Sequence, residues 1–249
     1  MTRPWFALAT GITAVLASGL ALLGCSDMST ADGPVVAPVQ CRDADQGSIV
    51  ASAPLVHIQS AVDAEGYFHL CTGVMLDAVT VLTAGHCIVG PTAWSVGTSN
   101  GQRAESVGSS TPFPSRDVAN VLHYPDIGII KLSPPGVQFP VYATLGGNAE
   151  YLDASFVVFR DKGGVERSPY SHSVQLFPGS SLTLGHVGAP YPYSYLSDHV
   201  ATHGDSGAPV FLPGGFTVVG ILAASGPCGN VITRIDQQLG WISANSKTD

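Results

Sequence analysis

The sequence has few charged residues: Asp, Glu, Lys and Arg make up 11% of its 249 positions, against about a quarter in an average soluble protein. Only 10 residues are Lys or Arg while 18 are Asp or Glu, so the formal net charge is −8. Such a chain lacks the basic surface that binds a phosphate backbone. Its hydrophobic share of 45% is too high for a disordered chain. Composition therefore excludes a nucleic-acid-binding protein and indicates a folded domain.

Long apolar runs are absent except at the N-terminus, where residues 5–23 follow a positively charged Arg3. This arrangement is typical of a signal peptide, and no other run is long enough to span a membrane. The run ends in Leu22-Leu23-Gly24-Cys25, which resembles the bacterial lipobox. The resemblance implies removal of residues 1–24 and lipidation of Cys25, which would anchor the protein to a membrane outside the cytoplasm. A plain secreted form and an uncleaved anchor are the alternatives.

Cysteine occurs only five times, and export would place these residues where disulfides persist. If Cys25 carries lipid, the remaining cysteines are Cys41, Cys71, Cys87 and Cys228. Four cysteines allow three different pairings, and their number alone does not choose among them.

The chain changes character after its first 48 residues. Residues 25–48 are rich in small and turn-forming residues without a lasting hydrophobic period, so we interpret them as a tether or pro-segment. From Ile49 onward, short β-branched and aromatic runs recur between turn residues, and they predict an all-β fold for residues 49–249. The runs are residues 55–59, 67–76, 79–83, 118–122, 127–132, 155–159, 173–176, 208–212, 216–224 and 231–235. Helical spacing appears only at the end, in Ile235, Leu239 and Ile242.

Three separated segments hold residues suited to acyl transfer. They are Thr83-Ala84-Gly85-His86-Cys87, residues 126–132, and Gly204-Asp205-Ser206-Gly207-Ala208-Pro209. Acyl transfer at neutral pH needs a hydroxyl nucleophile, a base whose pKa lies near the working pH, and a buried carboxylate that fixes the tautomer of the base. Ser206, His86 and Asp126 meet these needs, and they occur in the chain order His, Asp, Ser.

These segments resemble the TAAHC, DIALL and GDSGGP motifs of the trypsin-like serine proteases, over roughly residues 49–242. The resemblance implies two packed six-stranded antiparallel β-barrels with a C-terminal helix and an active site in the cleft. It also implies a secreted serine endopeptidase that hydrolyses protein or peptide substrates through an acyl-enzyme on Ser206, without cofactor or metal. The N–H groups of Gly204 and Ser206 would form the oxyanion hole. We expect a monomer.

The same resemblance assigns the substrate pocket. In the family, the residue six positions before the nucleophile forms the pocket floor, and here it is Val200. A buried Arg without a carboxylate partner is costly, so we expect a preference for apolar or small side chains. His203 would lie at the pocket rim, and Ala223-Ala224-Ser225 would pair with the substrate backbone. An alignment shift that placed Asp198 at the floor would instead favour Arg or Lys.

The resemblance also implies a Cys71–Cys87 disulfide around the histidine loop, worth about 3 kcal/mol in the chain-entropy model. Cys228 matches a family cysteine whose usual partner position holds Thr202 here. This departure leaves Cys228 either free or paired with Cys41.

Activation is expected to depend on Asp205, which the family buries beside the nucleophile. A buried carboxylate needs a paired cation. In the family that cation is a new N-terminal ammonium, released by cleavage before an Ile-Val pair, and Ile49-Val50 is the candidate pair here. The alternative is constitutive activity with another cation, such as an Arg side chain.

Two other functions would use parts of the same sequence. His199 and His203 are four residues apart, a spacing that can bind zinc on a helix, but no Glu follows the first His as in zinc proteases of that pattern. We therefore expect no metal site. The rival function is a surface binding module built on an inactive protease scaffold, because a fold does not by itself imply a function. The intact set of His86, Asp126 and Ser206 argues against that rival.

Overall fold

The computed structural model describes residues 47–62, 68–162, 165–179, 191–226 and 229–247. The predicted signal peptide, most of the predicted tether, and Cys25, Cys41 and Cys228 lie outside these described residues. Within them, no helix has both the length and the apolar character needed to cross a membrane.

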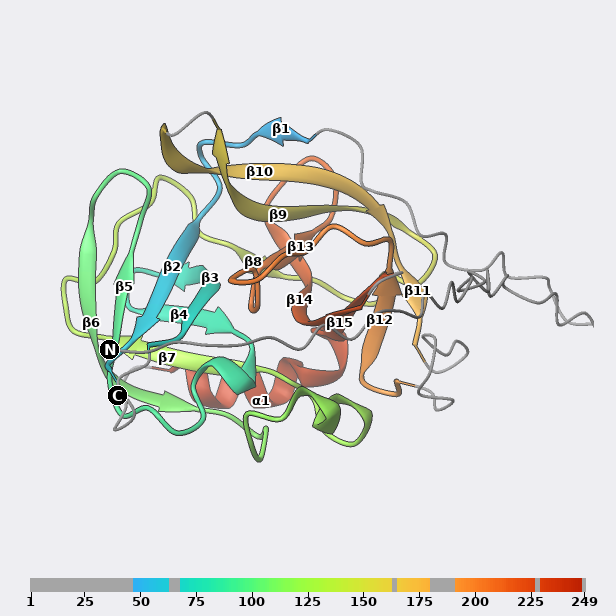
Figure 1. The fold of residues 1–249 in the computed structure, drawn as a ribbon, viewed down its shortest axis with the longest axis horizontal. Helices are drawn as coiled ribbons and strands as arrows, with labels where there is room; N and C mark the ends of the chain where they lie inside the picture. Colours follow the sequence, from blue (N-terminus) through green and yellow to red (C-terminus); the bar gives the residue numbers. More distant parts are fainter. Residues whose placement is uncertain (1–46, 63–67, 163–164, 180–190, 227–228, 248–249) are drawn as a thin grey trace, which may run out of the picture. The chain divides into compact units, whose positions relative to one another are not determined.

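Six strands from the first half of the chain close into an antiparallel barrel in the order β2-β3-β4-β7-β6-β5 (Figure 1). They are β2 (Leu55–Ser60), β3 (Leu70–Asp77), β4 (Thr80–Thr83), β5 (Trp94–Gly97), β6 (Arg103–Ser110) and β7 (Gly128–Leu132). The barrel closes where Ile58 of β2 pairs with Val96 of β5. Side chains such as Val74, Leu82 and Ile130 are fully buried, and each such burial stabilises the fold by about 1.5–3 kcal/mol.

The second half of the chain, joined by β1 from the first half, forms a nine-stranded, barrel-like sheet. Its main path runs β1-β10-β9-β13-β14-β15-β12-β11, and β8 pairs with β14 in parallel. The strands are β1 (Ser48–Ile49), β8 (Thr144–Leu145), β9 (Asp153–Lys162), β10 (Val165–Gln175), β11 (Phe177–Pro178), β12 (Ser194–Ser197), β13 (Pro209–Phe211), β14 (Thr217–Gly226) and β15 (Gly229–Arg234). One hydrophobic core contains Val74 and Leu82 of the first barrel together with Phe211 and Ile221 of this sheet, so the two sheets pack together.

The predicted fold class is confirmed, with one difference of detail. Both sheets are present and a helix closes the chain, but among the described residues only the first sheet is a closed barrel. The helix α1 (Leu239–Ser246) follows a 3₁₀ turn, η3 (Asp236–Gln238). Of the residues whose spacing predicted this helix, Ile235 and Ile242 are fully buried while Leu239 is partly exposed.

One strand prediction is wrong. The run 118–122 is a 3₁₀ helix, η2 (Val118–Leu122), because Asp117 caps its first turn: Oδ1 of Asp117 accepts a hydrogen bond from the N–H of Ala119 at 2.9 Å. The strands β5 and β6 were not predicted. The sequence of β6, from Arg103 to Ser110, holds mostly small and polar residues, and five of its eight positions are exposed, so it carries little hydrophobic signal.

Candidate active site

His86 and Asp126 come together because they flank neighbouring strands of the first barrel. The strand β4 ends at Thr83 and β7 begins at Gly128, and these two residues pair in the antiparallel ladder. A 3₁₀ turn, η1 (Gly85–Cys87), follows β4 and carries His86 beside the residues that precede β7. As a result, Nδ1 of His86 lies 2.6 Å from Oδ2 of Asp126, and the backbone N–H of His86 donates to Oδ1 at 2.8 Å.

The two side chains differ in exposure. Asp126 is fully buried, while the His86 side chain is 14% exposed. A buried carboxylate that accepts from Nδ1 holds the imidazole in the tautomer with the proton on that nitrogen. The second ring nitrogen, Nε2, is then left as the basic atom, and it lies 3.8 Å from Sγ of Cys87.

The turn that carries His86 requires glycine at position 85. A Cβ atom on Gly85 would lie 2.5 Å from Cβ of Phe113 and 2.5 Å from Oγ1 of Thr111. The same Thr111 hydroxyl donates to the carbonyl of Ile127 at 2.6 Å. Close packing therefore joins the histidine turn to the segment that carries Asp126.

Ser206 lies in a loop that precedes β13 and is held against β3 of the first barrel. The backbone N–H of Thr72 donates to the carbonyl of Ser206 at 2.8 Å, and Oγ1 of Thr72 donates to the carbonyl of Gly204 at 3.0 Å. Gly207 has a φ of 83°, and a Cβ atom there would lie 2.1 Å from the carbonyl oxygen of Thr72. The contact is thus made by backbone atoms, and a larger residue than glycine would push the loop away.

The predicted Cys71–Cys87 disulfide is present and joins β3 to η1. Its Cys87 sulfur lies 3.8 Å from Nε2 of His86 and 3.8 Å from the carbonyl oxygen of Ser206. The structure thus brings the His86 turn and the Ser206 loop to the same place. Among the described atoms, however, Ser206 Oγ makes no hydrogen bond with Nε2 of His86.

Asp205 is buried, with 3% exposure, and Thr202 binds it. Oδ2 of Asp205 accepts from the Thr202 N–H at 2.7 Å and from its hydroxyl at 3.1 Å. Ile49, the other residue of the predicted activation pair, is 57% exposed in β1 and pairs with Tyr170 of β10. In this intact chain the two residues are therefore not brought together.

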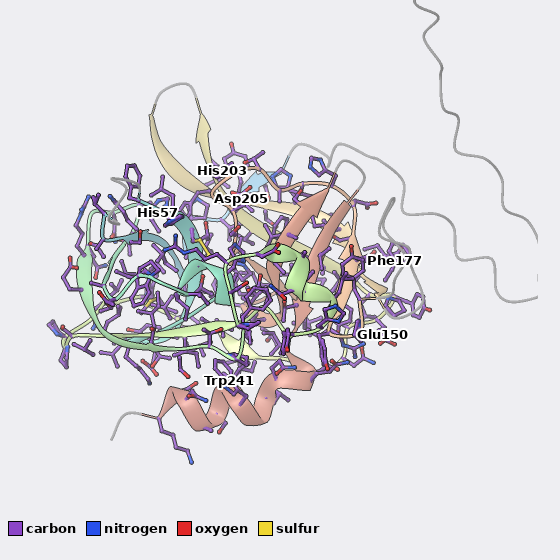
Figure 2. The ribbon with its side chains drawn as sticks, turned by 60° about the horizontal axis from the view of Figure 1, so that its bottom comes forward. His57, Glu150, Phe177, His203, Asp205 and Trp241 are labelled. Atoms are coloured by element: carbon purple, nitrogen blue, oxygen red, sulfur yellow. A yellow bond between two sulfur atoms is a disulfide. The ribbon has the colours of Figure 1, made fainter. Side chains whose placement is uncertain are left out.

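The predicted pocket residues lie in two segments: Val200 and His203 in the loop between β12 and β13, and residues 223–225 on β14. Val200 and Ala223 are buried, Ala224 is half-buried, and Ser225 and His203 are exposed. Figure 2 shows His203 and Asp205 on the opposite side of the view from Trp241 of the final helix.

Sequence reasoning missed Asn230, a fully buried residue of β15 below this region. Its Nδ2 donates to Oγ of Ser197 at 3.2 Å and to the carbonyl of Asp198, and its Oδ1 accepts from the N–H of Ala201 at 3.3 Å. Asn230 therefore fixes the segment that carries Val200. A polar residue directly before the apolar run 231–235 was the available signal.

Two of the three potential metal ligands at the site already form a disulfide with each other. Cys71, His86 and Cys87 offer ligand atoms within 4.8 Å of one another, in the part of the chain that the structure describes. The two sulfurs form a disulfide, so neither is a thiolate ligand. His199 and His203 belong to no such group among the described residues.

Strong electrostatic shifts occur in a separate cluster around Arg234, which pairs with Glu150 and Asp236. Burial raises the pKa of Asp236, but the hydrogen bond and the charge of Arg234 outweigh it and hold that pKa below its ordinary value. Burial raises the pKa of Tyr195 to about 12, and its ring lies 4.7 Å from the guanidinium carbon of Arg234. The cluster joins β15 to η3 and is structural.

Comparisons with known proteins agree with the observed fold. Residues 45–155 match the family model described as Trypsin, a span that contains His86 and Asp126 and ends before Ser206. No curated protein sequence matches the chain. The solved structure titled HL collagenase is 15% identical, with a TM-score of 0.66, over 82% of this chain and 98% of that one.

Two further solved structures have the same fold. A scabies mite inactivated protease paralogue is 16% identical, with a TM-score of 0.62, over 82% of this chain and 98% of that one. Human heparin binding protein is 18% identical, with a TM-score of 0.57, over 83% and 96%. The chain thus has the chymotrypsin-type protease fold, and residues 45–155 carry the match to the trypsin family.

Proposed function

We propose that this chain is a serine endopeptidase that hydrolyses peptide bonds through an acyl-enzyme on Ser206. The observation that carries the proposal is the fully buried Asp126 carboxylate, bound to Nδ1 of His86 at 2.6 Å beside the Ser206 loop. His86 removes the proton of Ser206 Oγ through Nε2 and later donates it to the leaving amine. Asp126 orients the imidazole and stabilises its positive charge. The hydrogen bond from Ser206 Oγ to Nε2 of His86 would form when substrate binds, because catalytic hydrogen bonds commonly tighten in the enzyme–substrate complex.

The N–H groups of Gly204 and Ser206 would stabilise the oxyanion. Within the described part of the chain, neither N–H donates a hydrogen bond, so both are free to donate to a substrate oxygen. The carbonyl groups of the same two residues are held by Thr72. Fixed donors of this kind need no reorganisation as charge develops on the oxyanion.

Primary specificity for apolar or small side chains is part of the proposal. Val200 would form the pocket floor, and its segment is supported from below by the hydrogen bonds of Asn230. Ala223-Ala224-Ser225 would pair with the acyl half of the substrate, with His203 at the rim. A peptide-library profile dominated by Arg or Lys would contradict this assignment.

For Asp205, the proposal is that cleavage before Ile49 activates the protein, because the new N-terminal ammonium would pair with the Asp205 carboxylate. The exposure of Ile49 supports access of a protease to the preceding bond. The new ammonium would have to leave its place beside β10 to reach Asp205. If protein with an intact Ser48–Ile49 bond shows full activity, Asp205 is neutralised from within the domain, with its Thr202 hydrogen bonds as part of that arrangement.

The N-terminal proposal is a lipid anchor outside the cytoplasm. Removal of residues 1–24 and lipidation of Cys25 would leave residues 25–48 as a tether, and a Cys41–Cys228 disulfide would keep the tether attached after cleavage at Ile49. The variant Cys25→Ala should move the protein from the membrane fraction to the soluble fraction. Unchanged fractionation would refute lipidation.

A second candidate function is an inactive binding module on the protease scaffold. The likeness to an inactivated scabies mite protease paralogue, and the lack of a Ser206–His86 hydrogen bond among the described atoms, favour it. It retains the fold without an activated serine.

A fluorophosphonate probe separates the two candidates, because only an activated serine reacts with it. We expect labelling of the mature protein and of the control Ser243→Ala, which alters an exposed serine on α1, and none of Ser206→Ala. No labelling of the mature protein, or equal labelling of Ser206→Ala, would reject the proposed mechanism.

A further inference from the structure

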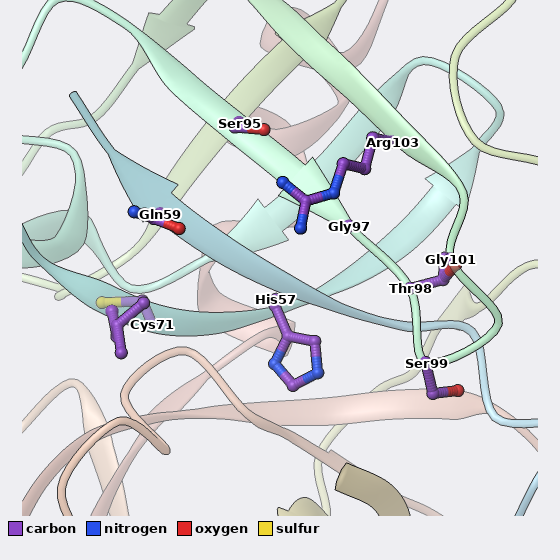
Figure 3. A pocket seen from close by; sticks show the side chains of 10 residues that line it. His57, Gln59, Cys71, Ser95, Gly97, Thr98, Ser99, Gly101 and Arg103 are labelled. Atoms are coloured by element: carbon purple, nitrogen blue, oxygen red, sulfur yellow. The ribbon is translucent and has the colours of Figure 1, made fainter. Parts of the chain in front are cut away.

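A pocket of about 410 Å³ lies on the first barrel (Figure 3). Its ten lining residues come from β2, β3, β5, the start of β6 and the turn between β5 and β6. They include His57, Gln59, Leu70, Ser95, Thr98 and Arg103. None of the ten is Asp or Glu, so the lining offers hydrogen-bond donors and a positive charge to a ligand.

Arg103 differs from three other basic residues of the described chain. Arg116 donates to the carbonyl of Val89, Lys131 donates to Oγ1 of Thr80, and Arg234 pairs with carboxylates. In the part of the chain that the structure describes, the side chain of Arg103 makes neither a hydrogen bond nor an ion pair, including with Glu105 on the same strand. Figure 3 shows its side chain reaching from β6 across β5 towards β2.

The opposite edge of the pocket is fixed by packing. The His57 ring stacks on Phe159 of β9, with 3.6 Å between ring centroids and 26° between ring planes. Phe159 is buried, so the imidazole is held between the two sheets. The pocket therefore has a preorganised wall as well as an exposed cation.

The pocket is connected to the catalytic residues through β3. Cys71 lines the pocket and forms the disulfide with Cys87, the residue after His86. His57 pairs in the β2–β3 ladder with Thr72, which holds the Ser206 loop. The strand β3 therefore joins the pocket to the Ser206 loop.

We infer that this pocket binds an acidic side chain of the substrate, on the leaving-group side of the scissile bond. The inference rests on the proposed endopeptidase function. The acyl half of the substrate would lie along β14, so the leaving half would reach the pocket. One guanidinium with neighbouring hydroxyl and amide groups suits a single carboxylate. A chain of net charge −8 is less suited to a polyanion.

Two peptides that differ only by Glu or Gln on the leaving side test the inference on the mature protein. We expect kcat/KM to be about five- to tenfold higher for the Glu peptide, mainly through KM, and Arg103→Gln to abolish the difference. The control Lys247→Gln removes the same charge from an exposed position outside this pocket and should retain the preference. An anilide substrate without leaving-side residues should be cleaved equally by all three proteins.

Equal cleavage of the two peptides by the unaltered protein, or a Glu preference that survives Arg103→Gln, would overturn the inference. The inference would also be overturned if Arg103→Gln lost as much activity on the anilide as on the Glu peptide, because that would indicate a structural role for Arg103.

Binding to Ser206→Ala gives a readout that does not depend on catalysis. In that background, the dissociation constant of a fluorescent Glu peptide should rise about five- to tenfold on adding Arg103→Gln. Tighter binding of a sulfated polysaccharide than of the Glu peptide, lost in Arg103→Gln, would overturn the choice of ligand. If the unaltered protein is not labelled by the probe but the Glu peptide still binds through Arg103, the proposed activity is rejected, and only the binding of an acidic side chain in this pocket is retained.

Discussion

Replacing Thr72 with Val tests whether the first barrel holds the oxyanion-hole loop. Thr72 is 1% exposed, and its hydroxyl donates to the carbonyl of Gly204 at 3.0 Å. Val has nearly the same shape, and it keeps the backbone bond from the N–H of residue 72 to the carbonyl of Ser206. The substitution therefore removes one donor from the loop with little change in packing.

The expected magnitude follows from that lost hydrogen bond. An unsatisfied buried acceptor costs about 1–3 kcal/mol, and because Gly204 is only half-buried we expect about 1 kcal/mol of lost unfolding free energy. In a domain of this size that corresponds to a fall in Tm of about 2–4 °C. A less constrained loop should also lower kcat by about tenfold with little change in KM, since the oxyanion donors act in the transition state.

The assay combines thermal unfolding with kcat and KM on an anilide substrate. Thr72→Ser keeps the hydroxyl and should retain most of the activity. Thr233→Val is the matched control, because the hydroxyl of this buried threonine has no hydrogen-bond partner among the described residues. If Thr72→Val turns over substrate like the unaltered protein, or loses no more stability than Thr233→Val, the hydrogen bond does not hold the loop.

Three further predictions concern other parts of the molecule. Asp126→Asn should lower kcat by about 10⁴ while circular dichroism shows an intact fold, because His86 would be held in the wrong tautomer; a loss below tenfold would contradict this. Replacing both Cys71 and Cys87 with Ser should lower the urea-unfolding free energy by about 3 kcal/mol, and an unchanged midpoint would refute it. Since Arg234 holds the pKa of Asp236 below its ordinary value, their pairing stabilises the fold above pH 4 and weakens as pH falls through the lowered pKa. The gap in Tm between the unaltered protein and Asp236→Asn should therefore be largest near pH 7 and shrink towards pH 3; a constant gap would contradict this.

Several features of the fold could be read directly from the sequence. Short β-branched and aromatic runs between turn residues predicted the all-β class, because such side chains pack well on a pleated sheet and turns must join short strands. The spacing of Ile235, Leu239 and Ile242 predicted the final helix; Ile235 and Ile242 are buried, and α1 itself begins at Leu239. The order of His86, Asp126 and Ser206 indicated the candidate site through resemblance. The same kind of short apolar run wrongly predicted a strand at 118–122, where capping by Asp117 gives a 3₁₀ helix.

By itself, then, the sequence determined the fold class, the C-terminal helix and the identity of the candidate catalytic residues, because these depend on local periodicity and on short motifs. Only the tertiary structure decided which backbone atoms support them. Thr72 is 132 residues from Gly204, and Asn230 is 29 residues from Ala201, yet hydrogen bonds join each pair. Such bonds form because strand pairing and the packing of two sheets bring distant segments together. The sequence around a hydroxyl or an amide in a strand does not reveal which distant residue it will bind.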